Sequence, residues 1–149
     1  MKVSEILKVK GNILYTVTPE TAMMDAVDTM AEKDIGSLVV MEHGELVGML
    51  TFREVMKMIH ANKGLVGDDN VRHHMDAQPI TVSPDTDLND VRRMMLERHA
   101  RYVPVVSEKT LLGVMSFYDV AKAVFEAQSF ENKMLKAYIR DWPSEGTEE

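Results

Sequence analysis

Leu112-Gly-Val-Met-Ser-Phe-Tyr-Asp119 is the stretch that decides the fold, because the chain carries a second version of it, Val47-Gly-Met-Leu-Thr-Phe-Arg-Glu54, 65 residues earlier. Each version is typical of a buried strand that runs directly into a helix. A hydroxyl residue stands where the helix would begin and an acid follows three residues later, which is the capping-box pattern. Because a helix N-terminus also attracts anions, the pattern has two interpretations: a structural cap, or contacts to phosphate and ribose.

The surroundings of both stretches repeat at the same offset. Thr16-Val-Thr-Pro-Glu-Thr21 returns as Thr81-Val-Ser-Pro-Asp-Thr86, and each copy predicts a short extended segment, an amphipathic helix, two strands and a second helix. Residues 63–70 contain two glycines and two aspartates and are typical of a linker. We therefore expect repeats at 1–62 and 71–125. Since a unit of this size cannot bury its own sheet, the two should pack sheet against sheet with pseudo-twofold symmetry.

The segments that lead into the repeats differ. Val3–Leu7 matches Val71–Met75, but at an offset of 68 instead of 65. The short apolar pattern predicts one helical turn over 3–7, followed by a loop over 8–12.

The second repeat continues where the first one stops. Apolar residues at helical spacing beyond Ala123 predict a C-terminal helical extension over 126–140. They are Val124, Phe125, Phe130, Met134 and Tyr138. This extension clasps a second copy of the chain, caps the module's own sheet, or is a solvated surface helix. Residues 141–149 are acidic and without periodicity, so we expect them to be disordered.

Composition argues against several classes of function. The net charge of −7 disfavours nucleic acid and anionic membranes as partners. There is no cysteine, which removes disulfides and thiolate sites. The chain shows neither a signal-peptide pattern nor an apolar run of the ~18 residues that a membrane span needs, so we expect a cytoplasmic protein.

The sequence also shows no pattern typical of a metal site or of a catalytic site. His73 and His74 are adjacent and cannot share a metal ion as an i, i+4 pair can, so no metal site is expected. No motif pairs a nucleophile with a base. We therefore expect a protein that is not an enzyme.

Three motifs of the second half, with weaker copies in the first, carry a resemblance to a known family. They are Thr81-Val-Ser-Pro-Asp-Thr86, Arg101-Tyr-Val-Pro-Val-Val106 and Gly113-Val-Met-Ser-Phe-Tyr-Asp119. Over residues 1–125 the chain resembles a tandem pair of cystathionine β-synthase (CBS) domains, often called a Bateman module. The resemblance implies an α+β (α/β) fold of two βαββα repeats packed through their sheets. It also implies two clefts that hold adenosine-containing ligands.

The resemblance further implies roles for residues of the second repeat. Asp119 would bind ribose hydroxyls, and Ser116 and Arg101 would contact phosphate. The base would lie against the segment 80–82. The predicted second-repeat cleft thus comprises Ile80, Thr81, Val82, Arg101, Tyr102, Ser116 and Asp119.

The first repeat departs from the family pattern. Glu54 replaces the usual aspartate, and Gly36 stands where the second repeat has Arg101; Arg53 is the candidate for the missing charge. The weaker first-repeat cleft would comprise Tyr15, Thr16, Val17, Gly36, Thr51, Arg53 and Glu54.

Together these features predict a regulatory module that binds an adenine nucleotide. AMP is the first candidate, followed by ADP, ATP, NAD(H) and S-adenosylmethionine. The module would form a homodimer and act on an effector protein in trans. The alternative hypothesis is an interaction module with empty clefts, in which both capping boxes are purely structural. A third hypothesis is the turnover of a nucleotide by an undetected catalytic site.

Overall fold

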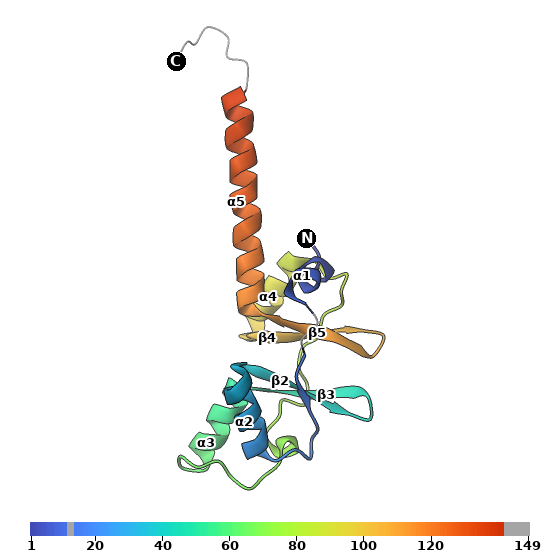
Figure 1. Cartoon of the computed structure of the whole chain (residues 1–149), viewed down its shortest axis with the longest axis vertical. Coiled ribbons are helices and arrows are strands. Elements are labelled where there is room, and N and C mark those ends of the chain that lie inside the picture. The colour runs from blue at the N-terminus through green and yellow to red at the C-terminus, as the bar shows by residue number, and fades with distance from the viewer. Residues whose placement is uncertain (12–13, 142–149) are drawn as a thin grey trace.

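The computed structural model describes residues 1–11 and 14–141. Two small sheets face each other in the middle of the molecule, and the helices cover their outer sides (Figure 1). A single long helix projects from one side and ends at the last described residue. The predicted arrangement of two βαββα repeats packed through their sheets is thereby confirmed.

The first repeat contains a three-stranded sheet in the order β1-β2-β3. Its elements are β1 (Thr16–Val17), α2 (Met23–Lys33), β2 (Ser37–Glu42), β3 (Glu45–Thr51) and α3 (Phe52–Ala61). β1 runs parallel to β2, and β2 runs antiparallel to β3. The buried side chains of Met23, Leu38, Leu50 and Met58 belong to one core between this sheet and its two helices.

The second repeat reproduces this arrangement in register. Its elements are α4 (Leu88–Arg98), β4 (Tyr102–Ser107), β5 (Thr110–Ser116) and α5 (Phe117–Asp141). Tyr102 pairs with Ser116 as Ser37 pairs with Thr51, and both hairpins carry a register shift at the same place. A parallel bridge between Val82 and Val105 takes the place of β1.

The segments that lead into the repeats are exchanged between them. α1 (Val3–Lys10) lies on the second repeat, where Val3 is fully buried in the core and its N–H donates to the Thr86 carbonyl at 3.0 Å. The 3₁₀ turn η1 (Val71–His73) lies on the first repeat, where Val71 donates to the Thr21 carbonyl at 2.8 Å. Each repeat therefore completes its core with the lead-in of the other.

The expected loop over 8–12 is wrong for its described part up to Lys10. α1 runs through Lys10 and ends at Gly11, whose φ of 93° and N–H bond to the Leu7 carbonyl form the C-cap. Glycine adopts this left-handed backbone without the Cβ penalty of other residues. The helix therefore ends at Gly11 and not after Leu7, and residues 8–10 are helical.

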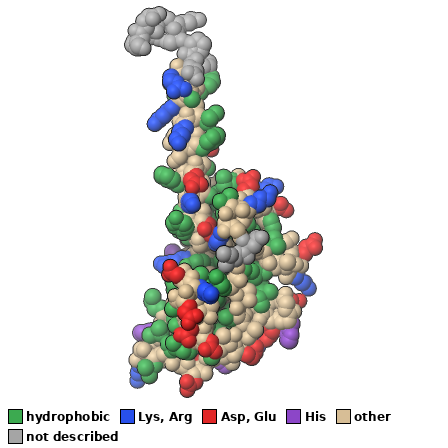
Figure 2. Space-filling view, in the orientation of Figure 1, with side chains coloured by type: hydrophobic (Ala, Val, Ile, Leu, Met, Phe, Trp, Pro, Cys, Tyr) green, Lys and Arg blue, Asp and Glu red, His purple; other side chains and the backbone are tan. Residues whose placement is uncertain are grey.

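α5 is one continuous helix of 25 residues, so the second repeat's last helix and the predicted extension are a single element. It points away from both sheets (Figure 1), which excludes the idea that the extension caps the module's own sheet. Figure 2 shows hydrophobic side chains along its projecting part, with lysine and arginine side chains on the other side. The predicted disorder of 141–149 concerns residues that, apart from Asp141, lie outside the described ones.

Candidate functional site

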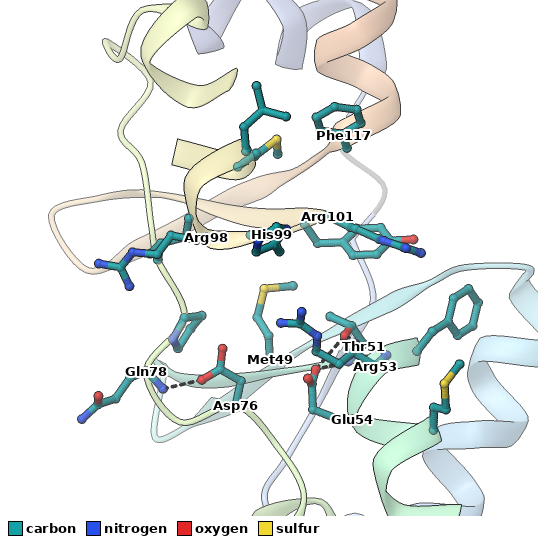
Figure 3. A pocket seen from close by; sticks show the side chains of 18 residues that line it. Met49, Thr51, Arg53, Glu54, Asp76, Gln78, Arg98, His99, Arg101 and Phe117 are labelled. Atoms are coloured by element: carbon teal, nitrogen blue, oxygen red, sulfur yellow. Dashed lines mark hydrogen bonds between the residues drawn. The ribbon is translucent and has the colours of Figure 1, made fainter. Parts of the chain in front are cut away.

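A cavity of about 660 Å³ lies between the two repeats, and we call it the inter-repeat cleft (Figure 3). Its first wall comes from β3 and α3 and consists of Met49, Thr51, Phe52, Arg53, Glu54 and Met56. The connecting segment contributes Asp76, Gln78, Pro79 and Ile80. The opposite wall comes from α4, β4 and the start of α5 and consists of Met95, Leu96, Arg98, His99, Ala100, Arg101, Tyr102 and Phe117.

The carboxylate of Glu54 is fixed on the first wall by a capping box. Its Oε1 accepts from the Thr51 backbone N–H at 2.9 Å and from the Thr51 hydroxyl at 2.7 Å. The Thr51 hydroxyl in turn accepts from the Arg53 N–H at 3.2 Å. Glu54 lines the cleft, and its described hydrogen bonds all use Oε1, so the cap leaves Oε2 as an acceptor. The structural interpretation of this pattern is thus confirmed, and it leaves room for a ligand contact.

The opposite wall carries positive charge. α4 ends at Arg98, and His99 takes a left-handed backbone with φ of 53° that turns the chain into β4. This turn places Arg98, His99 and Arg101 along one wall, across from Arg53 and Glu54, with Arg98 and Arg101 at opposite ends of that wall (Figure 3). Guanidinium groups bind phosphate through paired N–H donors. Although the chain has a net charge of −7, three arginines line this cleft and make its local charge suitable for an anion.

The connecting segment is held firmly beside the first wall. Asp76 and Met49 exchange both backbone hydrogen bonds, at 2.8 and 2.9 Å. The Asp76 carboxylate accepts from the Gln78 N–H at 3.0 Å, and this hydrogen bond stabilises a local turn. Beyond it, Pro79 and Ile80 supply apolar surface of the kind that an aromatic base packs against.

The structure regroups the residues that the sequence assigned to two separate clefts. Ile80, Arg101 and Tyr102, predicted for the second repeat, line the same cavity as Thr51, Arg53 and Glu54, predicted for the first. The remaining eight predicted residues are not among its lining residues: Tyr15, Thr16, Val17, Gly36, Thr81, Val82, Ser116 and Asp119.

The lining of this cavity thus differs from the predicted grouping, and the physical reason is the packing of the sheets. The sheets face each other and β3 contacts β5, so the helix start of one repeat lies opposite the strand start of the other. Val82 points into the core, where it is 6% exposed, and Thr81 beside it faces outward. The ligand contacts expected of the individual residues remain predictions.

Ser116 and Asp119 form the second capping box. Asp119 Oδ2 accepts from the Ser116 N–H at 2.9 Å, and the Asp119 N–H donates to Ser116 Oγ at 3.0 Å. Lys10 Nζ lies 2.7 Å from the same Oδ2. Burial by itself raises the pKa of Asp119, but the hydrogen bond from Lys10 and the bonds from Ser116 outweigh it and hold the pKa below its ordinary value.

Sequence reasoning missed several residues of the cleft. Arg98 and His99 stand immediately before the predicted strand in the run Arg98-His-Ala-Arg101, so a cationic cluster was visible there. Asp76, Gln78 and Phe117 carried no comparable signal, because only the packing of one repeat on the other brings them to this cavity.

Metal and membrane sites find no support among the described residues. No group of three or more histidine, aspartate or glutamate side chains in 1–11 and 14–141 is arranged to hold a metal ion. None of the helices in that part of the chain combines the length and apolar composition that crossing a bilayer requires.

Comparison with known proteins gives both halves of the chain the same assignment. The family model of the CBS domain matches residues 3–61 and again residues 70–126. The chain is similar to the mitochondrial CBS domain-containing protein CBSX3 of Arabidopsis thaliana, with 30% identity over 151 residues that cover 93% of this chain and 71% of the relative.

Two solved structures show the same fold. The CBS-domain-containing protein ATU1752 from Agrobacterium tumefaciens is 27% identical with a TM-score of 0.77, over 83% of this chain and 98% of that chain. CBSX2, solved in complex with AMP, is 27% identical with a TM-score of 0.68, over 77% of this chain and 90% of that chain.

Proposed function

Because the chain belongs to the CBS domain family, we propose that it is a regulatory module that binds an adenine nucleotide in the inter-repeat cleft. The observation that carries this proposal is the meeting of Arg98 and Arg101 from one repeat with Arg53 and Glu54 from the other around one cavity. A volume of about 660 Å³ suits a ligand of nucleotide size. The complex of the related CBSX2 with AMP makes AMP the first ligand to test.

Each part of a nucleotide has a counterpart in the cleft. The phosphate would lie on Arg101 with Arg53, since a guanidinium offers a fork of donors that matches phosphate geometry. The ribose hydroxyls would donate to Oε2 of Glu54. The base would pack on the apolar segment at Pro79 and Ile80. ADP, ATP, NAD(H) and S-adenosylmethionine share the adenosine part and differ in the groups offered to the arginines.

The output of the module would leave through α5. Phe117 is the first residue of α5 and also lines the cleft, so a ligand that moves its ring acts directly on the start of the projecting helix. A ligand shifts such an element only through different affinities for its two positions. We propose that the projecting part of α5 contacts a second copy of the chain in a homodimer, or an effector protein in trans in the cytoplasm.

Isothermal titration with AMP, ADP, ATP, NAD(H) and S-adenosylmethionine tests the proposal. Arg101→Met removes a charged pair of hydrogen bonds and should raise Kd about 10- to 100-fold. Arg93→Met is the matched control, because Arg93 lies on α4 outside the cleft and is paired with Asp90 at 3.1 Å. Equal affinities of the two variants, or hydrolysis of the bound nucleotide, would contradict a regulatory site at this place.

One observation favours the alternative of an interaction module with empty clefts. The projecting helix exposes large apolar side chains, among them Phe130 at 64% and Ile139 at 64%, and this surface needs no nucleotide to bind a protein. Absence of binding for all five ligands, together with a concentration-dependent oligomer, would select this alternative.

A further inference from the structure

Lys10, the last residue of α1, ties the N-terminal helix to the second capping box. Its Nζ donates to Asp119 Oδ2 at 2.7 Å and to the Val114 carbonyl at 2.6 Å. We propose that Lys10 is a built-in competitor for nucleotide at a second cleft, so that Asp119 accepts a ligand only after Lys10 has left it. This inference rests on the proposed function, because it takes the inter-repeat cleft as the pattern for the second one.

The pseudo-twofold relation between the repeats places the proposed second cleft beside Ser116 and Asp119, which correspond to Thr51 and Glu54 at the offset of 65. Glu54 lines the inter-repeat cleft, and the hydrogen bonds described for its carboxylate come from Thr51. Asp119 accepts from the Lys10 ammonium group as well as from Ser116.

The backbone explains why a lysine is needed there. In the first repeat, the Met49 carbonyl accepts from the backbone N–H of Asp76 at 2.8 Å. Val114 is the counterpart of Met49, and its carbonyl accepts from the Lys10 ammonium. The lead-in at this side is a helix, whose backbone donors are used internally, so a side chain supplies the hydrogen bond that a backbone amide supplies on the other side.

Helix α1 also holds Lys10 in reach. Leu7 lies so close to β5 that a Cβ at Gly113 would come within 2.9 Å of Leu7 Cδ2. The added turn that ends at Gly11 then carries Lys10 across Val114 towards Asp119. The Asp119 side chain is 18% exposed and that of Lys10 37%, which places the pair at the rim of the protein rather than in its core.

The chemistry makes Lys10 and a ribose competitors for one acceptor. A ribose hydroxyl and an ammonium group both donate to a carboxylate, and Oδ2 already accepts from the Ser116 N–H. The ammonium adds a charge, so a neutral hydroxyl replaces it at a loss. The inter-repeat cleft should thus fill first, and the second cleft should stay empty at ligand concentrations that saturate the first.

Isothermal titration with AMP and thermal unfolding without ligand test this inference together. We expect one AMP per chain for the wild type and a second site in Lys10→Met. Lys8→Met, an exposed lysine of the same helix, should keep the wild-type stoichiometry. In Arg101→Met, where the inter-repeat cleft is weakened, adding Lys10→Met should still create a site. Without ligand, the Tm losses of Lys10→Met and Asp119→Asn should be far from additive, because both remove the same pair.

The outcomes separate this inference from the proposed function. A wild type that binds no AMP and a Lys10→Met variant that binds it would overturn the inter-repeat cleft and support the competitor role of Lys10. Two equal sites in the wild type, no added site in Lys10→Met, or additive Tm losses would each overturn the competitor role. Loss of a site in Lys10→Met would overturn it as well, since Lys10 would then be a ligand contact.

Discussion

The phenol of Tyr102 lies against the backbone of Gly36, so that a Cβ at position 36 would clash with the phenol oxygen and come within 2.8 Å of Tyr102 Cζ. Phe52 closes the same space, with Cε2 at 3.0 Å from that Cβ position. Gly36 is the counterpart of Arg101. The first repeat therefore has no room for the arginine that the second repeat carries, because a tyrosine of the second repeat occupies its place. The two clefts cannot be equivalent.

Gly36→Ala should destabilise the protein by about 1–3 kcal/mol, the range for forcing an extra carbon into a packed site. Urea unfolding of Gly36→Ala, Tyr102→Ala and the double variant measures the coupling between the two positions. In the Tyr102→Ala background the cost of Gly36→Ala should fall strongly, because the clashing ring is gone. If Gly36→Ala alone left the free energy of unfolding unchanged, the Tyr102 ring would be able to move away from position 36 without cost.

The repeat pattern made much of the fold predictable. The constant offset of 65 between Leu46 and Leu111, and between Val55 and Val120, required equal strand and helix positions in both halves, and the strand registers agree. The two capping boxes followed from residue type and spacing alone, because a cap depends on neighbours within one turn.

The composition of the candidate site could not be predicted in the same way. Arg101 and Glu54 line one cavity, and Lys10 pairs with Asp119, because of how the repeats and their lead-in segments pack on each other. No local sequence pattern encodes that packing. The length of α1 was not predicted either. The apolar residues at helical spacing stop at Leu7, so no apolar signal marked the last turn of the helix, which carries Lys10.

Glu54→Gln separates the capping role of Glu54 from its proposed ligand contact. The amide oxygen of glutamine still accepts from the Thr51 N–H, so stability should fall by only a few tenths of a kcal/mol, against about 1 kcal/mol for Glu54→Ala. The affinity for AMP should fall about tenfold in both, since a ribose hydroxyl donates more strongly to a carboxylate than to an amide. Calorimetric titration and urea unfolding provide the two quantities. If Glu54→Ala lowered the affinity for AMP tenfold and Glu54→Gln left it unchanged, Glu54 would act only as a cap and not as a ligand contact.

The ion pair between Lys10 and Asp119 should make stability depend on pH in the acid range. The pKa of Asp119 in the folded protein lies below its ordinary value of 3.8, so the unfolded chain binds the proton first as the pH falls. The stabilisation is therefore complete above about pH 5 and is lost as the pH falls through the folded pKa. Because Lys10 is more than a third exposed, the ion pair stabilises the folded state by about 1 kcal/mol or less.

Thermal unfolding of the wild type and Lys10→Met as a function of pH measures this effect. The Tm difference should be largest near neutral pH and should shrink in acid, as the pH falls through the lowered pKa of Asp119 in the folded wild type. Lys8→Met should show no such dependence. A Tm difference that is constant from about pH 7 to pH 3 would mean that Lys10 acts through packing of its alkyl chain instead of its charge.

Phe130→Gln with Met134→Gln tests whether α5 joins two copies of the chain. Both side chains are exposed, at 64% and 57%, so the stability of the isolated chain should change by less than about 0.5 kcal/mol. In a dimer that buries them, each contributes about 1.5–3 kcal/mol, and the dimer Kd should rise about a hundredfold or more. Sedimentation equilibrium provides the Kd, and Lys133→Gln on the same helix is the control. A monomeric wild type would refute the homodimer. An unchanged Kd would move the dimer contact away from α5 and leave its apolar side chains to an effector protein.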